Sequence, residues 1–267
     1  MATGGARALP VDILHRPAGE AARLIALGFL DAAAAAQARL ADPEDLEALH
    51  DLRVALRRMR STLRAYRGTL GGTVAKKLRR HARDLARSTT AGREADVQLA
   101  WLRAQEAALS PRERAGFLWL EGRLEQRRRA AYDGLARRLP RAFAKLEQRL
   151  RRRLAIYRMK VHVGDGAAVP LFGAVAADAL RTQAGELLQR LEGVQDAADA
   201  PGQHAARIAT KRTRYLLEPL TARVQGGRVL VRDLQQLQDV LGELHDVHVL
   251  ADEVAAAVAE AAAARAR

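Results

Sequence analysis

The amino-acid sequence predicts an all-α fold from three observations. Alanine, leucine and arginine dominate its 267 residues, and aromatic residues contribute only 4%, a mixture that favours helices over sheets. No window alternates apolar and polar residues for long enough to indicate a strand. The basic phrase HDLRVALRRMR at 50–60 returns as HAARIATKRTR at 204–214, which indicates the duplication of a helical unit.

Proline and glycine residues set the expected helix boundaries in the first half of the chain. Residues 1–16 are expected to form a flexible N-terminus, and Pro17 opens the first helix. Asp42 is placed to cap the next helix, with Pro43 at its first position. Further helices are expected at about 73–88, 93–109 and 111–157, with a break at 89–92 and an interruption at Pro140.

The second half repeats this order after VHVGDGAAVP at 161–170, which has the composition of a linker. Pro170 opens a helix, and Pro201–Gly202 precede the helix with the second basic phrase. Gly226–Gly227 then separate it from two closing segments, RVLVRDLQQLQDVLG and ELHDVHVLADEVAAAVAEAAAARAR. We therefore expect one domain over 17–267, whose halves, 17–160 and 168–267, form antiparallel bundles related by a pseudo-two-fold.

One face of each basic helix carries a row of cations, which we call the basic stripes. At about 100° per residue, each row falls within one narrow sector. The stripes are His50, Arg53, Arg57, Arg60 and Arg64 in the first copy, and His204, Arg207, Lys211 and Arg214 in the second. Glu218 stands where the second stripe would continue, and the neighbouring apolar sector of the first helix is expected to face the core. Like charges three and four positions apart repel by a few tenths of a kcal/mol per pair, so two such rows favour an anion-binding surface over a solvated face.

Other cations extend the predicted site. They are Arg58, Lys76, Arg79, Arg80, Arg83 and Arg93 in the first half, and Arg212, Arg228 and Arg232 in the second. Beside so many cations, His50 and His204 are expected to stay neutral and to donate one hydrogen bond to an anion. Neither has a carboxylate or a second histidine at i+3 or i+4, so we predict no metal site and no cofactor. A divalent ion held by Asp84, Asp96, Asp239 and Asp246 stays open, although pairs with arginine are commoner.

The amino-acid composition indicates which partners and which cellular compartment to expect. The formal net charge of +14 predicts a polyanionic partner. The absence of cysteine excludes disulfides, thiolate metal sites and cysteine nucleophiles. The N-terminal residues lack the pattern of a signal peptide, and no stretch approaches the roughly 20 apolar residues of a membrane span. We therefore expect a cytoplasmic protein with no membrane partner.

The two basic phrases resemble the paired signature helices of the CHAD family, α-helical domains named for their histidines. LHDLRVALRRMRSTLRAY and HAARIATKRTRYLLE are similar to these helices, and LQQLQDVLGELHDVHVL is similar to a further family segment. TTAGREADVQL departs from the family at Thr89–Thr90, where Leu-Gly is usual. The resemblance covers about 17–260. It implies two four-helix bundles around a basic central trough or pore, and non-catalytic binding of inorganic polyphosphate, with polyphosphate granules as one destination.

Two other functions are compatible with so basic a chain. Nucleic-acid binding requires the same charge, but single-strand binders need stacking platforms. The aromatic candidates, Tyr66, Trp101, Trp119 and Tyr215, are not interleaved with the basic stripes. An enzyme is not expected, because no Walker loop, nucleophile elbow or cysteine motif appears. The preferred polymer length and the oligomeric state stay open.

Overall fold

The computed structural model describes residues 9–42, 45, 47–70, 72–155, 169–196 and 198–265. Within these ranges the chain is helical and contains no strand, so the all-α prediction is confirmed. The α-helices are α1 (Ala18–Arg39), α2 (Ala48–Ala65), α3 (Lys76–Ser88), α4 (Thr90–Ala104), α5 (Pro111–Ala155), α6 (Phe172–Glu192), α7 (Ala200–Leu217) and α8 (Gly227–Arg265). Short 3-10 helices are η1 (Ile13–His15), η2 (Glu106–Ala108) and η3 (Glu218–Leu220).

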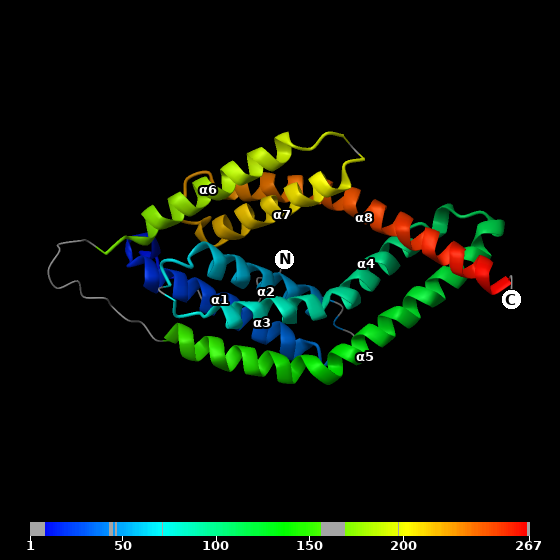
Figure 1. The fold of residues 1–267 in the computed structure, drawn as a ribbon, viewed down its shortest axis with the longest axis horizontal. Helices are drawn as coiled ribbons and strands as arrows, with labels where there is room; N and C mark the ends of the chain where they lie inside the picture. Colours follow the sequence, from blue (N-terminus) through cyan, green and yellow to red (C-terminus); the bar gives the residue numbers. More distant parts are fainter. Residues whose placement is uncertain are drawn as a thin grey trace.

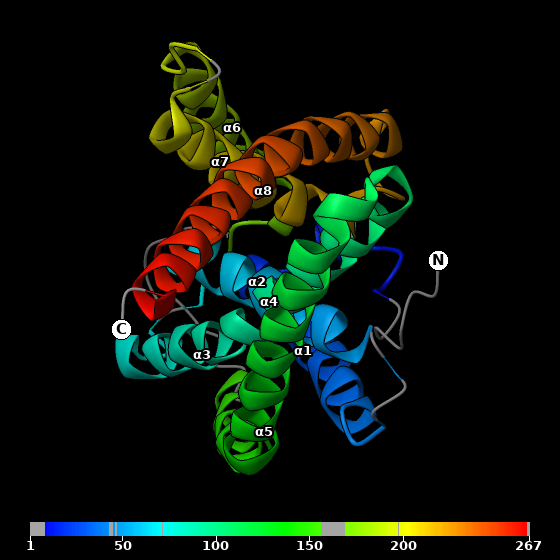
Figure 2. The same cartoon turned by 90° about the vertical axis from the view of Figure 1, so that its right-hand side faces the viewer.

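The helices form layers around α2 (Figure 1). The α6–α7 pair lies on one side of α1 and α2, and α5 lies on the opposite side, an arrangement that both ribbon views share (Figure 2). Helix α8 packs along α7 and continues to the far end of the molecule, where it meets α5. There Glu253 of α8 lies 3.5 Å from Arg123 and 2.5 Å from Arg127, both of α5.

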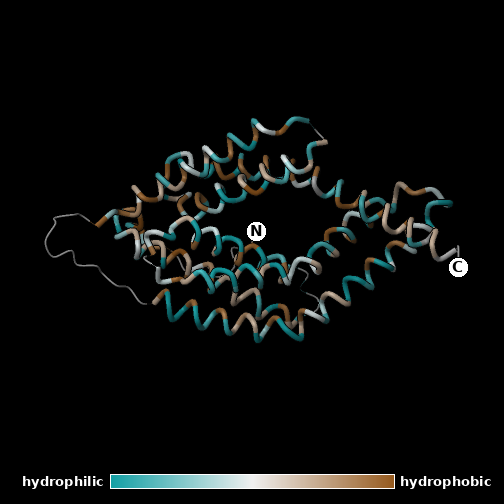
Figure 3. The backbone as a smooth tube through the Cα atoms, viewed as in Figure 1, coloured by the Kyte–Doolittle hydropathy of each residue, from teal (hydrophilic) through white to brown (hydrophobic). Residues whose placement is uncertain are grey.

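The apolar sector predicted beside the first stripe faces the core. Its members, Leu52, Leu56, Met59 and Leu63, are at most 1% exposed, as the helical periodicity predicts. They pack in one cluster with the apolar faces of α1, α3 and α5. Hydrophobic and hydrophilic residues alternate along the helices (Figure 3). Burying the apolar face of α2 turns its cationic face away from the core, toward α7.

Helix α2 begins later than its sequence signals indicate. The predicted cap at Asp42 is wrong, because the helix starts at Ala48 and no side chain caps it; Pro43 lies outside the described residues. Asp45 organises the turn instead. Its carboxylate accepts hydrogen bonds from Arg39 at 2.7 and 2.9 Å and from the backbone N–H of Glu47 at 3.2 Å.

The break predicted at 89–92 is confined to Thr89. Helix α3 ends at Ser88, and α4 begins at Thr90. Gly92 therefore lies inside α4, where a Cβ atom would come within 3.1 Å of Leu49 and 3.3 Å of Leu135. The missing side chain serves the close approach of α4 to α2 and α5 rather than a turn.

Two long helices are continuous where interruptions were expected. Helix α5 passes through Pro140, which removes one backbone hydrogen bond, and α5 bends along its length (Figure 1). Buried Leu139, Phe143 and Leu146 hold α5 to the core on both sides of this proline. The two closing segments form one helix, α8, so the described second half has three α-helices rather than a four-helix bundle. The pseudo-two-fold stays a prediction.

The packed chain begins before Pro17. Ile13 is fully buried, the backbone N–H of Phe172 donates to the carbonyl of Arg16 at 2.9 Å, and Arg223 donates to the carbonyl of Leu9 at 3.1 Å. These contacts correct the expected flexible segment for residues 9–16. The rest of it, 1–8, and most of the linker, 161–168, lie outside the described residues.

Helix α1 is more apolar than expected from the sequence. The helix has 22 residues, and a window within it has a mean hydropathy of 1.3, which is enough for a membrane span by length and composition. This corrects the expectation that no stretch comes close. Half of that window is buried within the fold. Alanine-rich positions such as Ala22, Ala26 and Ala33 are completely buried against neighbouring helices, as in a core helix.

Candidate anion-binding site

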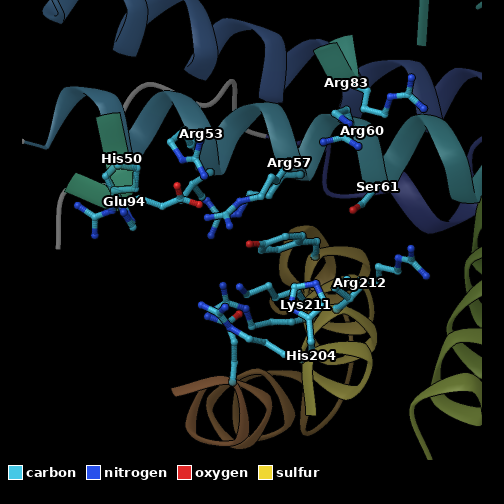
Figure 4. A pocket seen from close by; sticks show the side chains of 18 of the residues that line it. His50, Arg53, Arg57, Arg60, Ser61, Arg83, Glu94, His204, Lys211 and Arg212 are labelled. Carbon is cyan, nitrogen blue, oxygen red and sulfur yellow. The ribbon is translucent and has the colours of Figure 1, made fainter. Parts of the chain in front are cut away.

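A cavity of about 1100 Å³ lies between the two halves of the chain. Side chains of α2, α3 and α4 line it from the first half, and side chains of α7 and α8 line it from the second. Both basic stripes face this cavity, so the structure brings together two rows that are about 150 positions apart in sequence. Figure 4 shows Arg53 and Arg57 on one wall and His204 and Lys211 on the other.

Nearly all cations predicted for the site reach the cavity. Besides the stripes, the lining includes Arg58, Lys76, Arg79, Arg80, Arg83, Arg93 and Arg212. Arg228 and Arg232 are the exceptions, because the start of α8 turns them to the exterior, where Arg232 lies 3.3 Å from Asp233. The prediction treated them as counterparts of the cations in α3. The described second half has no helix equivalent to α3, since η3 and a short turn lead directly from α7 to α8.

Arg53 is anchored by the pair of threonines that departs from the family pattern. Its Nη1 donates hydrogen bonds to the hydroxyls of Thr89 at 2.8 Å and Thr90 at 3.2 Å. Burial, followed by the charge of Arg57, lowers the pKa of Arg53 to about 10, so the guanidinium stays charged at neutral pH. The junction between α3 and α4 thus orients the first stripe.

The stripe on α7 holds Lys211 among cations. Lys211 is partly buried and lies within 4 Å of no carboxylate in the described ranges. Burial lowers its pKa to about 7, helped by Arg207, Arg57 and Arg214 and opposed by Asp246. Arg207 has a buried Nε with no hydrogen-bond acceptor. This wall therefore carries more positive charge than the folded chain neutralises.

His50 sits at the N-terminal end of the first stripe, where the sequence predicts a neutral imidazole. Burial lowers its pKa, and the charge of Arg93 lowers it further. A histidine shifted in this direction is neutral at pH 7 and keeps one ring N–H to donate. His204 also lines the cavity, on the opposite wall and nearer to solvent.

Some arginines outside the cavity are matched by acids, whereas several inside it are not. Arg128 lies 2.8 Å from Asp96, and Arg151 lies 2.6 Å from Asp31. No ion pair within the described ranges involves the cavity cations Arg57, Arg60, Arg207 or Lys211. Unpaired cations that share a partly enclosed space repel one another unless an anion joins them. The excess charge of the chain is thus concentrated on the two walls of the cavity.

Four cavity arginines do have acid partners. Arg83 lies 3.3 Å from its neighbour Asp84, and the partners of the other three are distant in the sequence or on another helix turn. Glu186 of α6 lies 3.0 Å from Arg212. Glu218 lies 2.6 Å from Arg58 and 3.4 Å from Arg214. The contact between Arg58 and Glu218 joins the two halves of the chain, and no local sequence pattern around either residue predicts it.

Aromatic and acidic residues also enter the lining. Trp101 and Tyr215 border the cavity, although the sequence does not interleave them with the basic stripes. Trp101 is 41% exposed, but Tyr215 is 3% exposed. The guanidinium groups of Arg58 and Arg214 cover the ring of Tyr215 at 5.8 and 5.2 Å from its centre.

The acids give no metal cluster within the part of the chain that the structure describes, where no three histidine or carboxylate side chains gather. Of the four aspartates considered for a divalent ion, Asp239 and Asp246 line the cavity. Asp96 instead accepts hydrogen bonds from Arg128 and from the hydroxyl of Tyr132, each at 2.8 Å. Asp96 thus pairs with an arginine, the commoner arrangement for such an acid.

Comparisons with known proteins agree with the geometry. The family model of the CHAD domain matches residues 24–255. The chain is also similar to the crystal structure of the CHAD domain from the plant Ricinus communis, with 27% sequence identity and a TM-score of 0.73. That alignment covers 98% of this chain and 87% of the plant chain. A comparison with curated proteins finds no match.

Proposed function

Because the chain belongs to the CHAD domain family, we propose that it binds inorganic polyphosphate in the cavity between its halves and does not transform it. One observation carries the proposal: Arg57, Arg60, Arg207 and Lys211 face a shared cavity from two walls without an acid partner in the described ranges. A bound polyanion would neutralise this charge. Association with polyphosphate granules in the cytoplasm is compatible with such a role.

The shape of the charge favours a polymer over a small anion. Successive stripe residues rise by about 5 Å along the helix axis, so each wall offers a row of contacts. Arginine presents planar pairs of N–H donors that suit phosphate oxygens. A chain held by one wall is already close to the other, which raises the effective concentration for the second set of contacts.

Nucleic acid is the less favoured ligand. Duplex readers present a cationic helix outward to a groove, whereas the cationic faces of α2 and α7 point at one another (Figure 4). Single-strand binders stack successive bases on several open aromatic faces. In this cavity Trp101 is exposed, but arginines cover Tyr215.

Competition between polyanions tests the proposal. We expect long-chain polyphosphate to displace a labelled polyphosphate probe at lower phosphate concentration than duplex or single-stranded DNA. The difference should be at least about tenfold at physiological salt, because the cavity offers many cations and few stacking faces. Fluorescence anisotropy at two salt concentrations measures it, and affinity should fall steeply as salt rises. Equal competition by DNA would contradict the proposal.

The pH dependence of binding should report on Lys211. Below its pKa of about 7, Lys211 is charged before and after binding, so it adds no pH dependence. Above that value the empty cavity holds a neutral lysine that must take up a proton when an anion binds. Polyphosphate affinity should therefore fall from pH 7 to 9, by up to about tenfold per pH unit from this group. Calorimetry in buffers of different ionisation enthalpy measures the proton uptake.

Lys211→Met removes this titration and serves as the control, since it should flatten the slope between pH 7 and 9. The free protein provides an opposite signal. Between pH 7 and 10 Lys211 is neutral in the folded protein but charged in the unfolded chain. The unfolded chain then binds more protons, so the free energy of unfolding should rise with pH over this range. An unchanged binding slope in the Lys211→Met variant would assign the pH dependence to another group.

A further inference from the structure

One acid behind the cavity wall, Glu218, pairs with two arginines that line the cavity. Glu218 is the first residue of η3, directly after α7. Its Oε2 lies 2.6 Å from Nε of Arg58 on α2, and its Oε1 lies 3.4 Å from Nε of Arg214 on α7. The cavity acids Glu94, Asp239 and Asp246 form no ion pair within the described ranges. A single carboxylate thus bridges arginines from the two halves.

This bridge neutralises charge without using the donors well. The Nε atoms of Arg58 and Arg214 and the Oε2 atom of Glu218 are buried, and none has an aligned hydrogen-bond partner. Buried groups of this kind gain from a better acceptor. A phosphate group carries more oxygens than a carboxylate and matches the fork of a guanidinium.

The two arginines have a second support that does not depend on Glu218. Both guanidinium groups lie over the ring of Tyr215, which is 3% exposed and therefore fixed in the core. Cation–π contact of this kind holds an arginine in place when its ionic partner changes. The arrangement of Arg58 and Arg214 should persist if the carboxylate of Glu218 loses its charge.

We propose that Glu218 is a built-in anion that occupies the place of one phosphate group between Arg58 and Arg214, and that it thereby limits how many phosphates the cavity binds. The inference rests on the proposed function. On this view Glu218 is a specificity-determining residue. It closes the second stripe at its C-terminal end and leaves the unpaired cations, such as Arg57 and Lys211, for the ligand.

Neutralising Glu218 should open one more phosphate site. We expect Glu218→Gln to bind a defined long polyphosphate about tenfold more tightly, the effect of one charge-assisted contact. The plot of log affinity against log salt should steepen by about one, because one more phosphate displaces counterions. Polyphosphate should also raise the melting temperature of the variant more than that of the wild type, since the ligand supplies the missing negative charge.

Asp96→Asn is a matched control on the same chain. Asp96 is buried to a similar degree, with a side chain 14% exposed against 15% for Glu218. It pairs with Arg128, which lies over Tyr132 at 4.9 Å. Neither Arg128 nor Tyr132 lines the cavity, whereas Arg58, Arg214 and Tyr215 do. The substitution changes the net charge by the same amount. A diffuse effect of charge would raise affinity in both variants, whereas the proposal predicts the gain in Glu218→Gln alone.

A second pair of variants protects the test against misfolding. Arg58→Gln with Glu218→Gln removes both charges of the ion pair, so it leaves no new net charge at the contact. It should bind more tightly than Arg58→Gln alone, because Arg214 is freed, and less tightly than Glu218→Gln. Equal affinity of Arg58→Gln with and without Glu218→Gln would overturn the inference. If the wild-type protein does not bind polyphosphate at all, the proposed function is overturned instead.

Discussion

Reversing the charge of one residue on each wall, Arg57→Glu with Lys211→Glu, is expected to weaken polyphosphate binding by about 100-fold or more. Neither side chain has an acid partner within the described ranges, so the substitution removes two contacts that only a ligand would satisfy. It also introduces two carboxylates that would repel the bound anion. Isothermal calorimetry with a polyphosphate of defined length measures the loss.

The same double variant should keep its fold. The new carboxylates would face Arg207, Arg214 and other cations, so they relieve repulsion that the wild-type protein carries. The melting temperature should stay equal or rise. A fall of many degrees would mean that the affinity loss reports on unfolding rather than on the site.

A control with the same charge change comes from α5. Arg138 and Arg152 are exposed and form no ion pair in the described ranges, and they lie outside the cavity lining. Arg138→Glu with Arg152→Glu should lower affinity only a few-fold, through long-range charge. Arg128 and Arg151 are poorer controls, because their reversal breaks ion pairs with Asp96 and Asp31. Similar losses of affinity in the two double variants would indicate that polyphosphate binds a diffuse cationic surface rather than the cavity.

Lengthening the ligand should have the second largest effect. From triphosphate to a chain that spans a stripe, a distance of about 20 Å from the helical rise, affinity should increase at least about 100-fold. Each added phosphate reaches a further cation on one wall or the other, and the second wall engages a chain that is already held. Titrations with polyphosphates of graded, defined length measure the curve.

The curve should change slope once the cavity is filled. Beyond that length the only gain is statistical, because a longer chain offers more overlapping registers. Arg57→Glu with Lys211→Glu provides the control, since it interrupts both rows and should flatten the early rise. Affinity that stays constant from triphosphate upward would indicate one compact anion site and would favour a triphosphate ligand.

Local periodicity was sufficient to predict the orientation of the two basic helices. Apolar residues three and four positions apart must share the buried face, so Leu52, Leu56 and Met59 turned the first stripe to the opposite side. The repeat of the basic phrase then predicted a second wall of the same kind. The first inference needs only residues within a few turns of one another, and the second needs only the comparison of two such segments.

Helix ends and junctions were predicted less well. The sequence placed one break over 89–92 and another at Pro140, yet only Thr89 separates α3 from α4, and Pro140 lies inside α5. In both cases packing against other helices outweighs the local signal. The same holds for α8, which continues where the first half divides into separate helices, so Arg228 and Arg232 lie outside the cavity lining.

The sequence by itself determined the all-α class, the buried faces of the helices and the identity of nearly every cation in the cavity. Only the tertiary structure decided which of these cations are already neutralised. Arg57 and Arg58 are adjacent in sequence, but Arg57 has no ion pair in the described ranges, while Arg58 meets Glu218 from the other half of the chain. Lys211 acquires its pKa of about 7 from burial and from Arg57 across the cavity. Charge pairing and desolvation of a side chain depend on the groups that face it from other helices. The packing of helices that are distant in sequence decides which groups these are.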